Sequence, residues 1–161
     1  MQVSFTLRPI ESKDKEFIKE SLEENWGSVI IVTRGKLYDA SKLPGFLTEE
    51  EEQTLGFITY LIDENEMEII SLNSFKERVG VGSSLIDAVK KVAESKSIKR
   101  IWLITTNDNY PAVSFYQRRG FRVKAIHKNA IEQSRKLKPE IPVTGIGGVP
   151  VRDEIEMEMF I

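Results

Sequence analysis

The chain has 161 residues, of which 40% are hydrophobic and 30% are charged, a composition typical of one folded domain with a hydrophobic core. Its 23 Lys and Arg residues are balanced by 25 Asp and Glu residues, so the net charge of −2 excludes a broadly basic surface and argues against nucleic acid as a partner. Cysteine is absent and His127 is the single histidine, which excludes disulfides and cysteine nucleophiles and argues against a metal cofactor. We therefore predict one domain over residues 1–161.

The N-terminal segment gives no sign of export. Met1–Leu7 alternates polar and apolar residues and lacks the continuous apolar core of a signal peptide. No segment has the length of a membrane-spanning helix. These features predict a cytoplasmic protein with no membrane partner.

Hydrophobic periodicity predicts an alternation of strands and helices, and hence a mixed α/β fold. Apolar or alternating runs predict strands over Val3–Arg8, Val29–Thr33, Leu55–Ile62, Glu66–Leu72, Arg100–Thr105, Phe121–Lys128 and Ile155–Ile161. Helical spacing predicts helices that begin at Ser12 and Gly82 and that extend over Asn109–Gly120 and Asn129–Leu137. Glycine, proline and charged residues predict loops over Arg34–Glu52 and Lys138–Arg152.

Several side-chain orientations follow from these periods. In the first helix, Phe17 shares the buried face with Ile18 and Leu22, while the charged residues, Asp14 among them, stay in solvent. Asn129 with Glu132 predicts a capping box. In the last strand, Ile155, Met157 and Met159 form the buried face, and the alternating residues Glu154, Glu156 and Glu158 are expected to face solvent.

A glycine-rich turn precedes the most strongly periodic helix. In Gly80-Val81-Gly82-Ser83-Ser84, backbone N–H groups and the helix dipole favour an anion such as a pyrophosphate, and Arg78 adds a full positive charge. The turn is not a Walker loop, and Leu85 occupies the third glycine position of a dinucleotide-binding fingerprint. Tight-turn chemistry without a ligand is the alternative interpretation.

A second motif, Asn109-x-x-Ala112-x-x-Phe115-Tyr116-x-x-x-Gly120-Phe121, follows the next strand. The two motifs in this order resemble the acyl-CoA-binding core of the GCN5-related N-acetyltransferase (GNAT) superfamily. The resemblance implies a mixed, mostly antiparallel central sheet of about seven strands, split between the fourth and fifth strands and flanked by helices. Glu77 departs from the Gln or Arg common at its position in the family.

The resemblance also implies acetyl-CoA as cosubstrate. Pantetheine would pair with backbone near Ile70–Asn73, the N–H of Leu72 would polarise the thioester carbonyl, and Tyr116 would protonate the departing thiolate. The implied cofactor-binding residues are Ile70, Leu72, Asn73, Arg78, Val79, Gly80, Val81, Gly82, Ser83, Ser84, Asn109 and Tyr116.

The implied reaction is direct attack of an amine acceptor in a ternary complex. Glu68 is the candidate general base, because regular strand alternation places it on the same side as Ile70 and Leu72, where burial raises the pKa of a carboxyl group. The alternative function is a non-catalytic CoA-binding or sensory domain with the same fold.

The acceptor, a small molecule or a protein, is not specified by these motifs. In the family, the segment after the first helix and the connection between the last two strands shape its site. They supply the candidate residues Trp26, Arg34, Arg135 and Arg152, and His127 at the end of the strand Phe121–Lys128 is a further candidate. Their basic side chains suit an acceptor that carries a carboxylate or phosphate. Exposed sheet edges predict a homodimer.

Overall fold

The computed structural model describes residues 5–75 and 80–161. The chain divides into two compact units. The first comprises Met1–Val29, Asp39–Ile101 and Ile161, and the second comprises Ile30–Tyr38 and Trp102–Phe160.

The first unit is built on antiparallel strands in the order β1-β4-β5-β6. Its elements are β1 (Thr6–Pro9), α1 (Lys15–Trp26), β4 (Gly45–Glu50), β5 (Gln53–Asp63), β6 (Glu66–Ser74) and α2 (Val81–Ser95), with short 3₁₀ turns at Ser12–Asp14 and Ala40–Lys42. The hairpin predicted from Leu55 to Leu72 is confirmed as β5 and β6. Its turn contains Glu64 and Asn65, both with positive φ.

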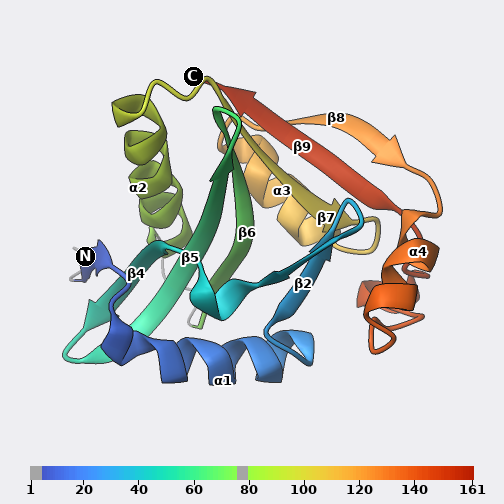
Figure 1. Cartoon of the computed structure of the whole chain (residues 1–161), viewed down its shortest axis with the longest axis horizontal. Coiled ribbons are helices and arrows are strands. Elements are labelled where there is room, and N and C mark those ends of the chain that lie inside the picture. The colour runs from blue at the N-terminus through green and yellow to red at the C-terminus, as the bar shows by residue number, and fades with distance from the viewer. Residues whose placement is uncertain (1–4, 76–79) are drawn as a thin grey trace. The chain divides into compact units, whose positions relative to one another are not determined.

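Helices α1 and α2 pack on opposite faces of these strands (Figure 1). On one face, a Cβ built on Gly56 would lie 3.1 Å from Cγ1 of Val81 in α2. On the other face, the Phe57 ring lies 5.8 Å from that of Phe75, which in turn lies 5.5 Å from the ring of Phe17 in α1. Adjacent residues of β5 therefore point to different helices, and the unit has three layers.

The second unit contains strands in the order β7-β9-β8 and a separate hairpin of β2 and β3. Its elements are β2 (Ile30–Thr33), β3 (Lys36–Asp39), β7 (Arg100–Thr106), α3 (Tyr110–Arg118), β8 (Arg122–His127), α4 (Ala130–Leu137) and β9 (Glu154–Phe160), with a 3₁₀ turn at Ile146–Gly148. The main sheet thus has seven strands, mostly antiparallel, with helices beside them. The predicted fold class is confirmed.

The predicted loop over Arg34–Glu52 is wrong, because this segment contains β3, a 3₁₀ turn and β4. Gly45 is part of strand β4, where a Cβ would collide with the carbonyl oxygen of Ile58 on β5. The glycine therefore permits a close approach of two strands rather than ending one.

The burial of side chains in and near the first helix also differs from expectation. Asp14 is buried, and its carboxylate accepts hydrogen bonds from Nη1 and Nη2 of Arg8 at 2.7 and 2.8 Å. Glu49 accepts a further bond from Nε of Arg8 at 2.8 Å. Phe17, predicted to be buried, is 41% exposed, whereas Ile18 is 1% exposed. Ion pairing with Arg8 of β1 therefore allows burial of Asp14, which the helical period assigned to solvent.

The predicted capping box at Asn129 is also wrong. Asn129 has a φ of 58° and makes no side-chain cap hydrogen bond. Its backbone N–H donates instead to Oδ1 of Asp153 at 2.8 Å, so a distant side chain fixes the start of α4.

Candidate functional site

The N-terminus of α2 has the geometry of an anion cradle. Gly80 adopts a φ of 98°, and its carbonyl accepts the N–H of Ser84 at 2.9 Å. A Cβ at Gly80 would meet nothing within 4 Å, so the backbone conformation, not crowding, calls for glycine here. Because glycine has no side chain to cap the helix, amide N–H groups of the first turn are available to an anion.

The predicted cradle residues divide into those that the structure describes and those that it does not. Val81 is buried and anchors the first turn, while Gly82, Ser83 and Ser84 are half-buried around it. Arg78 and Val79 lie outside the described residues.

Strand β6 contains a β-bulge that changes which side chains share a face. Its register with β5 pairs Ile58 with Leu72, Thr59 with Ser71, Tyr60 with Ile69, and Leu61 with Glu68. Ile70 is therefore the extra residue, and strand alternation is reversed across it. The prediction that Glu68 lies on the same side as Leu72 is wrong: Glu68 lies on the side of Ser71 and Asn73.

This side of β6 faces α1, since Asn73 pairs with Phe57, whose ring points toward that helix. Glu68, Ser71 and Asn73 are 5%, 4% and 7% exposed, so three polar side chains are buried along one row. The Ser71 hydroxyl lies 2.5 Å from that of Thr59 on β5. Among the described residues, Oδ1 of Asn73 is buried and has no hydrogen-bond partner.

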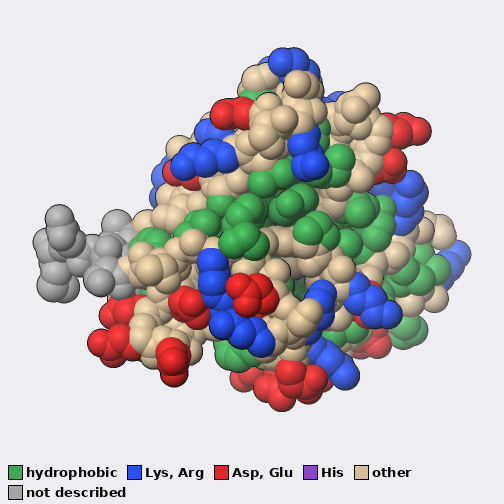
Figure 2. Space-filling model, turned by 60° about the vertical axis from the view of Figure 1, so that its left-hand side comes forward, with side chains coloured by type: hydrophobic (Ala, Val, Ile, Leu, Met, Phe, Trp, Pro, Cys, Tyr) green, Lys and Arg blue, Asp and Glu red, His purple; other side chains and the backbone are tan. Residues whose placement is uncertain are grey.

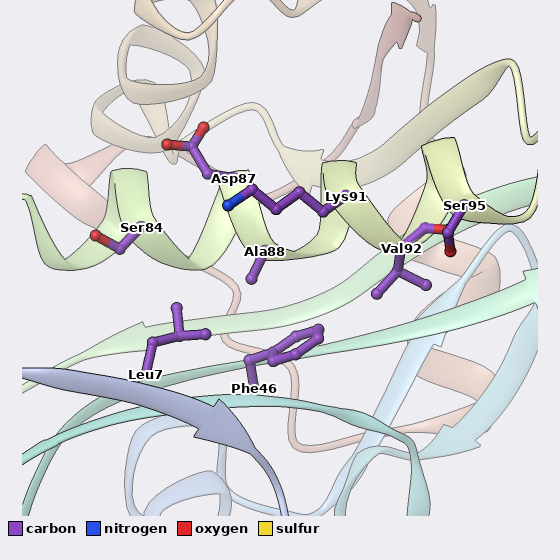
Figure 3. A pocket seen from close by; sticks show the side chains of 8 residues that line it. All are labelled: Leu7, Phe46, Ser84, Asp87, Ala88, Lys91, Val92 and Ser95. Atoms are coloured by element: carbon purple, nitrogen blue, oxygen red, sulfur yellow. The ribbon is translucent and has the colours of Figure 1, made fainter.

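The opposite face of the first unit carries an apolar groove of about 510 Å³ between α2 and strands β1 and β4. Figure 2 shows hydrophobic side chains gathered on this side of the molecule, with charged side chains around them. In Figure 3, Leu7 and Phe46 point from the strands toward Ala88 and Val92 of α2. Leu7, which lines this groove together with Ala88, is 38% exposed. The sheet separates this groove from the polar row of β6.

In the second unit, α3 carries the other predicted cofactor residues. Asn109 caps the helix, with Oδ1 accepting the N–H of Ala112 at 3.3 Å. Tyr116 is 8% exposed, and its ring packs edge-on against Phe115 and Phe121 at centroid distances of 5.2 and 5.4 Å. Burial raises the pKa of the Tyr116 hydroxyl well above its ordinary value. The phenol therefore stays protonated, as a proton donor must before it acts.

The turn before Asn109 is bonded to the long loop of residues 138–152. The Asn107 amide donates from Nδ2 to the Pro150 carbonyl at 2.8 Å, and its Oδ1 accepts the N–H groups of Arg152 and Asp153 at 2.9 and 3.0 Å. Asp108 is buried, and its Oδ2 accepts the N–H of Ile146 at 3.1 Å. These hydrogen bonds therefore fix the backbone conformation of the loop.

Two of the predicted acceptor residues stabilise that same loop. The Arg135 guanidinium donates to the carbonyls of Ile141, Pro142 and Val151, with distances of 2.7 to 3.3 Å. Arg152 takes part through its backbone, with its N–H donating to Asn107 and its carbonyl accepting from Ile131. The guanidinium of Arg135 thus has partners inside the protein, and its role in binding an acidic acceptor stays a prediction.

Arg34 is likewise bonded internally. Its Nη1 lies 2.8 Å from Oε1 of Glu154, and its backbone N–H donates to Oε2 of the same carboxylate at 3.2 Å. Nearby, Nζ of the buried Lys138 donates to the Ile30 carbonyl at 2.8 Å, and burial lowers the pKa of this lysine. The β2–β3 hairpin is thereby fixed to β9 and to the end of α4.

The expectation that the glutamates of β9 face solvent is wrong. Glu154, Glu156 and Glu158 are 1%, 8% and 5% exposed. Each lies near a basic side chain: Arg34 for Glu154, His127 at 2.9 Å and Lys124 at 3.6 Å for Glu156, and Arg122 at 3.4 Å for Glu158. The neighbouring basic side chains compensate the negative charges of the glutamates. This face of β9 can therefore be buried although its residues are charged.

Trp26 belongs to the first unit and is 45% exposed at the C-terminal end of α1. Within residues 5–75 and 80–161, no group of three or more His, Asp or Glu side chains is arranged to hold a metal ion. In the same residues, no helix has the length and apolarity needed to cross a membrane.

Comparison with known proteins decides the family. Residues 8–121 match the family described as the Acetyltransferase (GNAT) family. The chain belongs to the GNAT acetyltransferase family. This confirms the resemblance inferred from the two motifs, and a GNAT acetyltransferase is the class of enzyme to which the chain is assigned.

The chain is also similar to individual proteins in sequence or in fold. The GNAT chain is 39% identical over 142 residues to the uncharacterized protein YxbD of Bacillus subtilis, covering 88% of this chain and 89% of that one. Its fold matches the IAA acetyltransferase from Bacillus cereus with a TM-score of 0.71 and 16% identity, covering 98% of this chain and 100% of the other. It also matches a GNAT family acetyltransferase from Elizabethkingia anophelis with acetyl-CoA bound, with a TM-score of 0.70, 18% identity and 98% coverage of both chains.

Sequence reasoning missed the Asn73 side chain, because the resemblance assigned only the backbone of that residue to the cofactor. The polar residues Glu68, Ser71 and Asn73 among the apolar residues of this strand were the available signal. It does not follow a period of two, and the bulge is what brings its members to one face.

Proposed function

We propose that this GNAT protein transfers an acetyl group from acetyl-CoA to an amine by direct attack within a ternary complex. The observation that carries the proposal is Tyr116, a buried and protonated phenol on α3. A domain that only binds CoA has no need of a buried proton donor, so Tyr116 favours the enzyme over the non-catalytic alternative.

The residues present fit acetyl-CoA, which supplies an acetyl group already activated as a thioester. In the first unit, the N-terminal amides of α2 around Gly80–Ser84 are suited to the pyrophosphate, and the backbone of Ile70–Asn73 to the pantetheine arm. In the second unit, the Asn109 amide is suited to the same arm. Leu72 is proposed to donate its N–H to the thioester carbonyl.

The chemical step conserves atoms and charge as follows. The acceptor nitrogen forms a bond to the carbonyl carbon, and the bond from that carbon to sulfur breaks. The leaving thiolate takes the hydroxyl proton of Tyr116, and the surplus proton of the nitrogen passes to a base.

Glu68 remains the proposed base, with a changed geometry. Glu68 and Leu72 point to opposite sides of β6. They are also separated by about 10 Å along the strand, at roughly 3.3 Å per residue with one residue absorbed by the bulge. Proton transfer to Glu68 therefore requires a chain of water molecules.

For the acceptor, we propose an amine that does not require an acidic group. Of the basic residues first considered, Arg34 is bonded to Glu154 and Arg135 to backbone carbonyls. The guanidinium groups of Arg34 and Arg135 therefore already have hydrogen-bond partners within the protein. His127 is bonded to Glu156 in the same way.

Calorimetric titration with acetyl-CoA and CoA, together with thiol release in the presence of amines, tests the proposal. We expect micromolar binding of both nucleotides and thiol release that depends on an added amine. Binding without release from any amine would favour the non-catalytic alternative, and absence of binding would reject the cofactor assignment.

A further inference from the structure

The buried amide of Asn73 presents an oxygen for which the folded chain supplies no donor. Asn73 is 7% exposed, and its Oδ1 has no hydrogen-bond partner among the described residues. A buried acceptor without a donor lowers stability, because it loses its hydrogen bonds to water on folding. Such a group indicates a role outside the stability of the fold.

The neighbouring polar side chain shows how the same strand satisfies such a group internally. Ser71, on the same face and equally buried, shares a hydrogen bond of 2.5 Å with Thr59 across the hairpin. The residue opposite Asn73 is Phe57, which is fully buried and has no polar side-chain atom. The hairpin therefore has a donor for Ser71 and none for Asn73.

We propose that Oδ1 of Asn73 accepts a hydrogen bond from an N–H group of the acceptor amine. This rests on the proposed function, in which the adjacent Leu72 donates its backbone N–H to the thioester carbonyl. Leu72 and Asn73 are adjacent on β6, with Cα atoms about 3.8 Å apart, so the proposed sites for the thioester and the amine are neighbours on this strand. The ligand class is a primary or secondary amine, approaching from the side of β6 that faces α1.

A neutral amide suits this task better than a carboxylate. The attacking nitrogen must be uncharged, and a carboxylate would favour the ammonium form. Phe57 lowers the local polarity, which likewise disfavours a charged amine. The amide carbonyl can therefore orient one N–H while the nitrogen lone pair stays directed at the carbonyl carbon.

The first arm of the test uses the full chain with spermidine, lysine amide and glycine amide as amine probes. Thiol release by the unaltered protein with any of them supports the proposed function, and its absence with all three rejects that function for these amines. With an accepted amine, Asn73→Leu should raise the acceptor KM by about tenfold or more, the effect of losing one hydrogen bond to a polar ligand. The acetyl-CoA Kd should stay unchanged, and Asn73→Asp, which keeps an oxygen, should recover part of the loss.

The second arm separates this role from a purely structural one. Asn73→Leu removes a buried oxygen without a partner and should raise Tm, whereas the matched control Thr59→Val breaks the bond to Ser71 and should lower Tm while leaving the acceptor KM unchanged. An Asn73→Leu protein that is less stable than its parent would overturn the proposal. So would one that binds acetyl-CoA more weakly with an unchanged acceptor KM, because the amide would then serve the cofactor.

Discussion

Contact between Gly145 and Asp108 predicts a strong coupling between two single substitutions. A Cβ on Gly145 would collide with Oδ2 of Asp108 and would lie 2.5 Å from its Cγ and 2.9 Å from its Cβ. Rotation of the carboxylate alone leaves the Cβ contact too short, so the loop must move by about 1 Å or more. That shift breaks the hydrogen bond from the Ile146 N–H to Asp108.

The magnitude follows from these contacts. Loss of a hydrogen bond to a charged acceptor costs about 1.5–3 kcal/mol, and overpacking costs about 1–3 kcal/mol. We therefore expect Gly145→Ala to lower the free energy of unfolding by about 3 kcal/mol. Asp108→Ala, which loses the bonds to Ile146 and Thr106, should cost about 2–3 kcal/mol.

Urea unfolding of the single and double variants is the assay. In the double variant the carboxylate is gone and only the 2.9 Å contact with the Cβ of residue 108 remains, so Gly145→Ala should cost about 1–2 kcal/mol beyond Asp108→Ala, leaving a coupling of about 1–2 kcal/mol. Val143→Ala in the same loop, at a side chain 72% exposed, is the control and should change stability by less than about 0.5 kcal/mol. Additive effects of the two substitutions would refute the steric argument.

Three further predictions concern the cofactor site, the proton donor and acid stability. Gly80→Ala forces a side chain into a φ of 98°, so it should cost about 1–2 kcal/mol and weaken CoA binding measured by calorimetry; unchanged stability would contradict the strain. Tyr116→Phe should lower kcat about a hundredfold while the acetyl-CoA Kd stays constant, and an unchanged kcat would remove the proton-donor role. Hydrogen bonding from Arg8 lowers the pKa of Asp14 below its ordinary value of 3.8, so this carboxylate stabilises the fold above that pH and its contribution is lost as pH falls through the lowered pKa. Acid unfolding of Asp14→Asn should accordingly show a shallower dependence on pH than that of the parent, and an equal slope would contradict the assignment.

Local patterns were sufficient for the regular elements. Strands β5 and β6, helix α2, and the start of α3 near Asn109 all follow from short-range hydrophobic periodicity. Each of the two motifs on which the family resemblance rests is likewise one continuous segment of the sequence.

The errors arise where a distant residue changes the local preference. The bulge at Ile70 is visible only in the register with β5, and it moved Glu68 to the other face. Glu154 alternates as an exposed residue would, but Arg34, far away in the sequence, allows its burial. Gly45 resembles a strand breaker until the carbonyl of Ile58 is placed against it.

The same reasoning explains why the candidate acceptor residues were the weakest part of the prediction. A basic residue in a loop has the same appearance in sequence whether it binds a ligand or a carbonyl of its own chain. The Arg135 guanidinium, for example, donates to backbone oxygens of Ile141, Pro142 and Val151.

The anchoring of the loop of residues 138–152 also makes it a favourable place for engineering. The hydrogen bonds that Asn107, Asp108 and Arg135 make to this loop go to its backbone and not to its side chains. Val143 and Ile146, which are 72% and 43% exposed, can therefore be randomised while the path of the chain is retained. A library at these positions, with Gly145 kept constant, would vary the surface chemistry of a GNAT enzyme on a fixed scaffold.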